Sequence, residues 1–349
     1  MIPFMHNTVT LVIGDLHLRD YKNNRDYLDC QVSSIITLLK KVDSNIVIFL
    51  GDVFHFRKPS AREILAFKKI LSYIEYNSGW VHILRGNHDS ETKGDDGITT
   101  LSVFDGYDGI VVHDHYGREN GMGFTFIPHY ENQEIIEKAL SDIPENDIVF
   151  GHFGYKGAYN SQGDYDSEVD LSCFKNRTLL GHVHSFKHAS DLVTTLGTPF
   201  STEYADAGKT HMVAMIDDVD SNDLIKFIPV DHGIRHLKFN YSELEANKDF
   251  INDPNRLTYL RVYFNELTDF NALSLRKEIF SNYNVRWVDV KFHPLVDTEK
   301  AMSTFETGKE IFTIDDTLIE KYVDENTTDI PKSDLMDGLE ILKNEDQDS

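Results

Sequence analysis

Short apolar segments that each end in a glycine followed by Asp, Asn or His constrain this chain more than any other feature of its sequence. Such segments are typical of buried strands, and they alternate with longer stretches in which apolar residues recur at helical spacing. Strands are expected at residues 8–14, 45–50, 80–84, 123–127, 147–150, 178–180, 191–196 and 212–216. Helices are expected at residues 25–42 and 60–77, the second with Ser60 as its N-cap. The alternation predicts an α/β fold over residues 8–217, with helices packed on sheets.

Five polar segments follow these strands directly and contain residues of the types that bind metals. In α/β sheets functional groups gather beyond the carboxyl ends of the strands, so the five segments are expected at one rim of the fold. Glycine at the start of each segment would let the backbone turn sharply and come close to an ion. The segments are Gly14-Asp15-Leu16-His17, Gly51-Asp52-Val53-Phe54-His55, Gly86-Asn87-His88-Asp89, Gly151-His152 and Gly181-His182-Val183-His184.

The residue types in these segments indicate which metals and which chemistry to expect. Asp, Asn and neutral His are mixed nitrogen and oxygen ligands, which suit Mn, Fe or Zn better than an all-oxygen calcium site does. A carboxylate with two oxygens can bridge two ions about 3.5–4 Å apart, an arrangement that activates a hydroxide and stabilises charge on phosphate. Each segment alone is explained as well by a polar turn or a loop histidine. Their joint occurrence predicts a metal site.

In this order the segments resemble the motifs of the calcineurin-like metallophosphoesterase superfamily, over about residues 8–217. The resemblance implies a two-sheet α/β sandwich core that binds two divalent metal ions and hydrolyses phosphodiesters through a metal-bridging hydroxide. It also implies that Asp52 bridges the ions and that His88 is the catalytic histidine and general acid. Carried over residue by residue, one metal is held by Asp15, His17, Asp52 and His184, and the other by Asp52, Asn87, His152 and His182.

The segment that begins at Gly51 narrows the resemblance. It lacks the Asp-Arg-Gly of Ser/Thr protein phosphatases, and its Phe54-His55 followed by Pro59-Ser60 resembles the SbcD-type nucleases, the exonuclease subunit of double-strand-break repair. The segment at residues 196–199 is similar to a Gly-Ser/Thr-Pro segment of that family, and the chain length and short tail resemble its phage version.

The resemblance to SbcD-type nucleases implies a metal, activities and partners. The metal would be Mn²⁺ and the substrate DNA, cleaved by a 3′→5′ exonuclease and a single-strand endonuclease activity. The chain would form a homodimer through helices near residues 60–77 and 98–107. A coiled-coil ABC-type ATPase would bind the C-terminal tail.

Several residues near the five segments are candidates for which two explanations stay open. His55 stands where phosphatases have an Asp paired with the catalytic histidine; we hypothesise that it positions DNA ends, and the alternative is a histidine packed in a loop. Arg57 and Lys58 could contact phosphate, although a solvated helix face also accounts for this basic run. His129 could touch substrate from a loop at the same rim. His113 and His115 flank an expected turn, which predicts that both lie at the surface.

Beyond the metal-binding segments the chain has two further parts. We expect residues 1–232 to form the nuclease domain and residues 233–296 a small β-α-β capping domain that contacts DNA. Its strands are expected at residues 257–264 and 285–292, and its helix at 270–283. Residues 297–349 form the expected ATPase-binding tail, with two short amphipathic helical pieces. The tail has 16 acidic and 5 basic residues. The net charge of the whole chain, −24, taken alone argues against nucleic-acid binding, but it is unevenly placed and does not exclude a DNA substrate; ordinary solubility also explains it.

Composition sets the remaining limits. Cys30 and Cys173 are too few for a disulfide framework, and no apolar run is long enough to span a membrane or to form a secretory signal. We therefore expect a cytoplasmic protein, in the host cytoplasm if it is phage-encoded. Three functions stay open: a DNA nuclease, a small-molecule or nucleotide phosphodiesterase on the same dimetal centre, and a non-catalytic scaffold subunit that recruits the ATPase.

Overall fold

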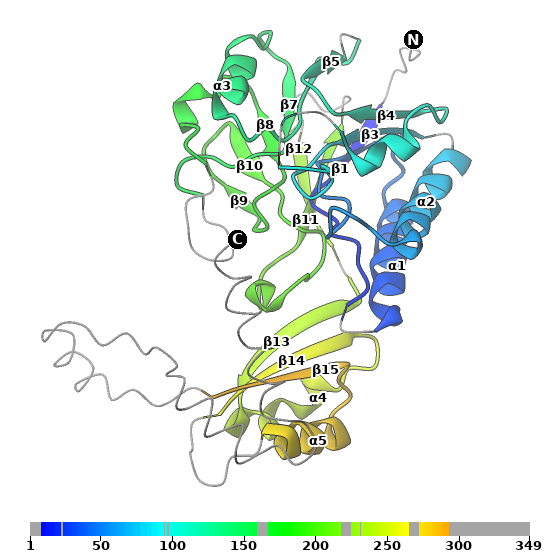
Figure 1. Ribbon diagram of the computed structural model, residues 1–349, viewed down its shortest axis with the longest axis vertical. Helices are drawn as coiled ribbons and strands as arrows, with labels where there is room; N and C mark the ends of the chain where they lie inside the picture. Colours follow the sequence, from blue (N-terminus) through cyan, green and yellow to red (C-terminus); the bar gives the residue numbers. More distant parts are fainter. Residues whose placement is uncertain are drawn as a thin grey trace, which may run out of the picture. The chain divides into compact units, whose positions relative to one another are not determined.

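The computed structural model describes residues 8–292, apart from residues 22–23, 78, 94, 96–97, 120, 159–166, 218–224, 231 and 265–271. Contacts divide the chain into the units Met1–His293 and Pro294–Ser349. The acidic tail expected at residues 297–349, with its helical pieces, therefore lies outside the described residues. In the described part of the chain the strands form two six-stranded sheets and one three-stranded sheet (Figure 1).

The first sheet has the strand order β12-β11-β1-β2-β3-β4. Strands β1 to β4 are parallel, whereas β11 and β12 run antiparallel to their neighbours. Two long helices, α1 (Arg25–Lys41) and α2 (Ala61–Tyr76), connect the parallel strands. The strands are β1 (Val9–Ile13), β2 (Ile46–Phe49), β3 (Trp80–Leu84), β4 (Ile110–His113), β11 (Met212–Asp217) and β12 (Ile225–Pro229).

The second sheet has the order β5-β6-β7-β8-β10-β9, with a parallel centre of β6, β7, β8 and β10. Its edge strands β5 and β9 are antiparallel to their neighbours. One α-helix, α3 (Gln133–Ser141), leads from β6 to β7. The strands are β5 (Gly117–Glu119), β6 (Phe124–Ile127), β7 (Ile148–Gly151), β8 (Thr178–Leu180), β9 (Lys187–His188) and β10 (Val193–Thr195).

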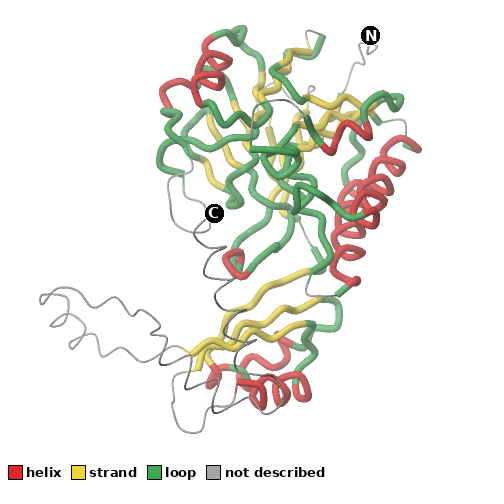
Figure 2. The backbone as a smooth tube through the Cα atoms, in the orientation of Figure 1, coloured by secondary structure: helices red, strands yellow, loops and turns green. Residues whose placement is uncertain are grey.

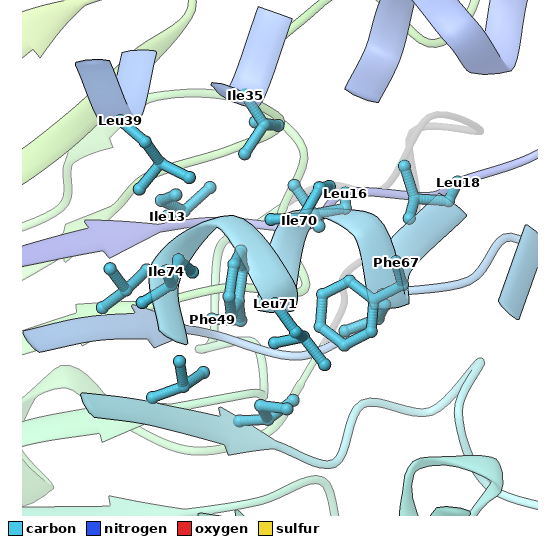
Figure 3. Close-up of a cluster of buried hydrophobic side chains, with 14 of the residues drawn as sticks. Ile13, Leu16, Leu18, Ile35, Leu39, Phe49, Phe67, Ile70, Leu71 and Ile74 are labelled. Carbon is cyan, nitrogen blue, oxygen red and sulfur yellow. The ribbon is translucent and has the colours of Figure 1, made fainter. Parts of the chain in front are cut away.

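Three apolar cores hold these layers together. Side chains of α1 and α2 pack on the outer face of the first sheet, where Phe67 and Ile70 lie near Phe49 (Figure 3). A second core fills the space between the two sheets, with Val12 and Ile48 from one sheet and Phe150 from the other. A third core covers the outer face of the second sheet with α3. The result is the α/β sandwich that the motif order predicted, with helices outside and both sheets inside (Figure 2).

The third sheet differs from the expected β-α-β unit by one strand. Its order is β13-β14-β15, and both pairings are parallel. The strand β13 (Ile234–Asn240) was not anticipated, because its charged and polar residues interrupt the apolar alternation that is typical of a strand. β14 (Leu257–Phe264), α5 (Ala272–Asn282) and β15 (Trp287–Phe292) match the predicted elements. The short helix α4 (Lys248–Ile251) packs with α5 on one face of this sheet.

Most of the other sequence predictions also agree with the structure. Ser60 caps α2 in a reciprocal capping box, accepting a hydrogen bond from Glu63 N and donating its own N–H to the Glu63 carboxylate. Edge strands β4, β5, β9 and β12 were missed, because all four are short and β5 and β9 are polar as well. Five 3₁₀ helices occur in the described residues, at Thr100–Phe104 (η1), Leu171–Cys173, Tyr204–Asp206, Tyr241–Glu243 and Glu245–Asn247. Every helix in the described ranges is too short or too polar to cross a bilayer.

The predicted surface position of His113 is wrong. Its ring is buried at the end of β4, stacks on Phe126 with ring centroids 3.9 Å apart, and its Nε2 lies 2.9 Å from His82 Nδ1. Burial lowers the pKa of His82 to about 4, and burial and then His82 lower the pKa of His113 to about 3. Both rings are therefore neutral at pH 7. They belong to the core between the sheets.

This buried pair predicts how stability depends on pH. Unfolded histidines titrate near pH 6.5. Between about pH 7.5 and about pH 5.5 the unfolded chain therefore binds protons that the folded pair does not bind. This difference lowers the free energy of unfolding by about 1 kcal/mol per ring. As the pH falls over this range, we expect the free energy of unfolding of His113→Gln to decrease by about 1 kcal/mol less than that of wild type, measured by urea unfolding in EDTA. His115→Gln, at an exposed position, is the control. Equal losses in wild type and His113→Gln would contradict the interpretation.

Candidate metal centre

The first cluster of candidate ligands comes from the loops that follow β1 and β8. His17 Nε2 and His184 Nε2 are 2.9 Å apart, and Asp15 Oδ2 lies 3.9 Å from His184 Nε2. Ligand atoms of these three residues all lie within 4.8 Å of one another. Burial lowers the pKa of His17 well below its usual value and lowers that of His184 as well. Both rings are therefore neutral at pH 7, and each keeps a nitrogen lone pair for a metal.

The second cluster contains Asp52, His152 and His182, with ligand atoms again within 4.8 Å of one another. His152 Nδ1 donates to the Leu50 carbonyl at 2.6 Å, so Nε2 is the ring nitrogen that faces the other candidate ligands. That nitrogen lies 3.4 Å from Asp52 Oδ1 and 3.2 Å from Asn87 Oδ1. An imidazole nitrogen, a carboxylate oxygen and an amide oxygen this close together are the mixed nitrogen and oxygen ligands that suit Mn, Fe or Zn. The donor set therefore fits a metal ion.

Asp52 lies between the two clusters. Its Oδ2 is 3.6 Å from His17 Nε2, and its Oδ1 is 3.4 Å from His152 Nε2. One carboxylate oxygen thus faces each cluster, which is the position that a bridging ligand requires. Burial opposes the charged form of Asp52, but the neighbouring histidines, His152 first and then His17 and His88, together outweigh burial and hold the pKa of Asp52 well below its usual value. A buried negative charge therefore stands between the two candidate metal positions.

Three candidate ligands have a left-handed backbone: φ is 45° at His17, 47° at Asp52 and 71° at His182. Residues other than glycine rarely adopt this conformation, and such strain concentrates at functional sites. Of the glycines that begin the five segments, only Gly51 has a positive φ, 102°. The sharp turn expected at the glycines is therefore made largely by the ligands themselves.

The glycines contribute space. A Cβ on Gly86 would overlap the Asp52 amide nitrogen and Oδ1, and a Cβ on Gly181 would lie 2.5 Å from Asp15 Oδ1. Any larger residue at these positions would push the strand-end loops apart. The glycine pattern in the sequence thus marks places where one loop presses against the ligand of another.

Comparison with known proteins agrees with this geometry. A model of the family described as calcineurin-like phosphoesterase matches residues 8–186, a range that contains both clusters. This chain belongs to that family. It is also 24% identical, over 345 aligned residues covering 86% of this chain and 89% of the relative, to the DNA double-strand break repair protein Mre11 of Nanoarchaeum equitans (strain Kin4-M). The superfamily resemblance drawn from the motif order is therefore confirmed, and the protein is a phosphoesterase.

The phosphoesterase site has two further histidines beside the clusters. His88 is partly exposed, and its Nδ1 donates to the His55 carbonyl at 2.5 Å. Its backbone N–H donates to Asp52 Oδ1 at 2.8 Å. The His55 ring lies 5.8 Å from the His88 ring and contacts Arg19. Burial and then Arg19 lower the pKa of His55 to about 3, so this ring is neutral.

A buried carboxylate that the sequence interpretation left without a role holds two of the loops together. Asp89 accepts hydrogen bonds from the backbone N–H groups of Gly86 at 3.0 Å and of Val53 and Phe54 at 3.3 Å each. Burial and then the charge of Asp52 raise the pKa of Asp89 to about 7. Its place at the end of the Gly86–Asp89 segment was the signal that could have revealed it.

Arg85 is a second residue that was missed. It is fully buried, and its guanidinium donates to the His129 carbonyl at 2.7 Å and to Ser90 Oγ at 2.8 Å. A charged residue between the apolar end of β3 and Gly86 was the available signal. Arg85 therefore ties the loop after β3 to the loop after β6.

The three residues proposed to contact substrate, Arg57, Lys58 and His129, differ in their surroundings. Arg57 Nη1 donates to the carbonyls of Ser90 at 3.0 Å and Thr92 at 2.7 Å, so it braces the loop after His88. Lys58 is exposed beside it. The ring of His129 lies 5.4 Å from the ring of His182, at the edge of the second cluster. Contact of these three residues with substrate stays a prediction.

The packing at Gly86 can be tested without an activity assay. Gly86→Ala is expected to displace Asp52 and to weaken Mn²⁺ binding by at least about tenfold, the scale of losses when the support of a ligand is disturbed. Gly121→Ala is the matched control, because a Cβ there meets nothing within 4 Å. Calorimetric titration with Mn²⁺ gives the affinities. Equal Mn²⁺ affinities in the two variants would show that the absence of a Cβ at Gly86 does not matter for the position of Asp52.

Proposed function

We propose that this phosphoesterase is a metal-dependent DNA nuclease that processes double-strand breaks. The observation that carries the proposal is the position of Asp52, one oxygen toward each of two clusters of histidines and acids. Likeness to a relative named as a DNA double-strand break repair protein supports DNA as the substrate. Finer features follow from the motif resemblance alone: Mn²⁺, 3′→5′ exonuclease and single-strand endonuclease activities, and a phage origin.

The proposed mechanism assigns a role to each group of the site. Two divalent ions held by the two clusters would supply positive charge to the scissile phosphate and activate a water nucleophile. The His55 carbonyl can only accept a hydrogen bond, so His88 must carry a proton on Nδ1 and turn Nε2 toward the reacting groups. In its protonated form His88 would donate from Nε2 to the leaving oxygen.

The role of His88 predicts a loss of turnover with metal binding preserved. His88→Asn is expected to lower kcat on linear duplex DNA with Mn²⁺ by about 10²–10⁴-fold, the usual contribution of a general acid. His115→Asn, at an exposed position, is the control. Metal analysis should give the same Mn²⁺ content in both variants. Unchanged kcat in His88→Asn would exclude His88 as the acid.

The same assays separate the two alternative functions. A small-molecule or nucleotide phosphodiesterase would turn over bis(p-nitrophenyl) phosphate while leaving duplex and single-stranded DNA intact. A non-catalytic scaffold would cleave neither and would hold less than one metal ion per chain after loading with Mn²⁺. We propose that the three-stranded parallel sheet β13-β14-β15 contacts DNA, a role that neither alternative function would need. A cytoplasmic location stays a prediction.

A homodimer is proposed on an exposed apolar surface made by α2 and η1. These two elements adjoin, since the rings of Phe67 and Phe104 are 5.2 Å apart. On their outer side Leu65 is 64% exposed and Val103 is 54% exposed. Burial of such side chains against a second copy would stabilise a dimer.

The dimer proposal is tested by changing Leu65. Leu65→Glu is expected to convert the dimer to a monomer in size-exclusion chromatography with light scattering, because a charge would be buried at the interface. Leu273→Glu changes an equally exposed apolar residue of α5 and is the control. A monomeric wild type, or a dimeric Leu65→Glu protein, would contradict the proposal.

The ATPase partner is proposed from the acidic tail, which lies outside the described residues. An amphipathic piece near residues 333–342 would bind a groove of a coiled-coil ABC-type ATPase. Deletion of residues 310–349 is expected to abolish co-purification of the ATPase and to leave Mn²⁺-dependent nuclease activity within about twofold of wild type, because every candidate ligand precedes residue 186. Co-purification with the truncated chain would refute this role.

A further inference from the structure

Arg19 lies two residues after His17 and is only 8% exposed. One guanidinium nitrogen, Nη1, contacts His55 Nε2, and the other, Nη2, donates to the Thr202 carbonyl at 2.6 Å. The planar group also lies over the ring of Tyr21, with Cζ 4.5 Å from its centroid. A buried arginine with both terminal nitrogens engaged is held in one orientation, because its fork is rigid.

The contact with Arg19 determines the tautomer of His55. A guanidinium has only donors, so His55 Nε2 must be the acceptor and the proton of the neutral ring must be on Nδ1. The backbone carbonyl of His55 in turn accepts from His88 Nδ1 at 2.5 Å. A series of contacts therefore leads from Arg19 through His55 to His88, the proposed general acid.

Backbone hydrogen bonds between the loops that contain Arg19 and His55 support this series of contacts. His17 N donates to the Asp52 carbonyl and Leu18 N to the Val53 carbonyl, each at 2.9 Å, and His55 N donates to the Leu18 carbonyl at 3.2 Å. The loops after β1 and β2 thus run side by side. Arg19, in the loop after β1, contacts the His55 ring in the loop after β2. A change at Arg19 would be transmitted to His55 first.

We propose that Arg19 is a positioning residue of this phosphoesterase, which acts on the reaction by fixing the His55 ring and, through the His55 carbonyl, the orientation of His88. The inference rests on the proposed hydrolytic function. It also gives His55 a role different from direct contact with DNA, since Arg19 occupies Nε2.

The contact with Thr202 extends this role toward the three-stranded sheet. The segment around Thr202 is held by Asp206, which accepts hydrogen bonds from Thr202 N and Thr202 Oγ1 at 2.9 Å each. Close by, Ser201 Oγ lies 2.9 Å from His236 Nδ1 of β13, and Tyr204 donates to the Leu260 carbonyl of β14. Arg19 therefore links His55 to the segment on which this sheet is anchored.

A double-mutant cycle tests whether Arg19 acts through His55. Arg19→Met keeps an unbranched side chain that replaces the aliphatic part of arginine, and it removes every donor. On linear duplex DNA with Mn²⁺, whose alkoxide leaving group needs the acid, it is expected to lower kcat by about 10–100-fold with KM within about threefold, because a misplaced catalytic group is costly. In a His55→Ala background the same change should lower kcat by less than about threefold, since the partner is already absent. Equal losses in both backgrounds, or no loss in Arg19→Met alone, would overturn the proposal.

Two further measurements exclude a general structural effect. Mn²⁺ content and the unfolding midpoint of Arg19→Met are compared with those of Arg118→Met, which removes a guanidinium that pairs with Asp147 on the second sheet. Arg118→Met is expected to lower stability and to leave kcat within about twofold of wild type. If Arg118→Met lowers kcat as much as Arg19→Met does, the loss reflects stability and the proposal fails.

A spectroscopic readout keeps the inference separate from the proposed function. Nitrogen-15 NMR of labelled histidines in metal-free protein, with the His55 signal assigned by its absence from His55→Ala, should show the Nδ1–H tautomer in wild type and its loss in Arg19→Met. A wild-type Nε2–H tautomer would overturn the inference. Wild-type protein that has the expected tautomer but hydrolyses no phosphodiester would instead refute the proposed function and leave the fixing of His55 by Arg19 intact.

Discussion

The buried carboxylate of Asp52 is the constraint on which the rest of the site depends. A charge with almost no access to water is tolerated only when it is paired and hydrogen-bonded. Asp52 meets this condition through the His88 backbone N–H on one oxygen and the imidazoles of His17 and His152 on either side. These partners come from the ends of three different strands, β1, β3 and β7. The two sheets must therefore bring their carboxyl ends to the same place for the charge to be stable.

Packing between the sheets sets how closely those strand ends approach. The core between the sheets contains apolar side chains from both, such as Ile48 and Phe150, which are fully buried. Because such a core is close-packed, it allows little adjustment in the spacing of the strands. The strand-end loops come still closer through two local features, the absence of a Cβ at Gly86 and the left-handed backbone at three candidate ligands. A strained backbone persists there because the surrounding packing determines it.

Around the candidate ligands, a small number of charged side chains fix the loops. Asp89 collects three backbone N–H groups from two loops, and Arg85 joins the loop after β3 to the one after β6. Arg19 does the same for His55 and Thr202. None of the three was assigned a role from the sequence. Their partners are mainly backbone groups, and any residue can supply those, so the pairing leaves no pattern in the sequence.

The sequence by itself determined the family and the set of candidate ligands, because Asp, Asn and His after apolar strands must gather at the carboxyl edge of an α/β fold. It also determined the long helices and the buried parallel strands, whose periodicity is strong. It did not determine β13, which is half-polar, or the edge strands, which are short. These segments become strands only by pairing with their neighbours. Only the tertiary structure decided that Asp52 stands between the clusters, that His113 is buried against Phe126, and that Arg19 reaches His55. Each of these depends on contacts between segments far apart in the chain, and such contacts are set by packing rather than by local propensity.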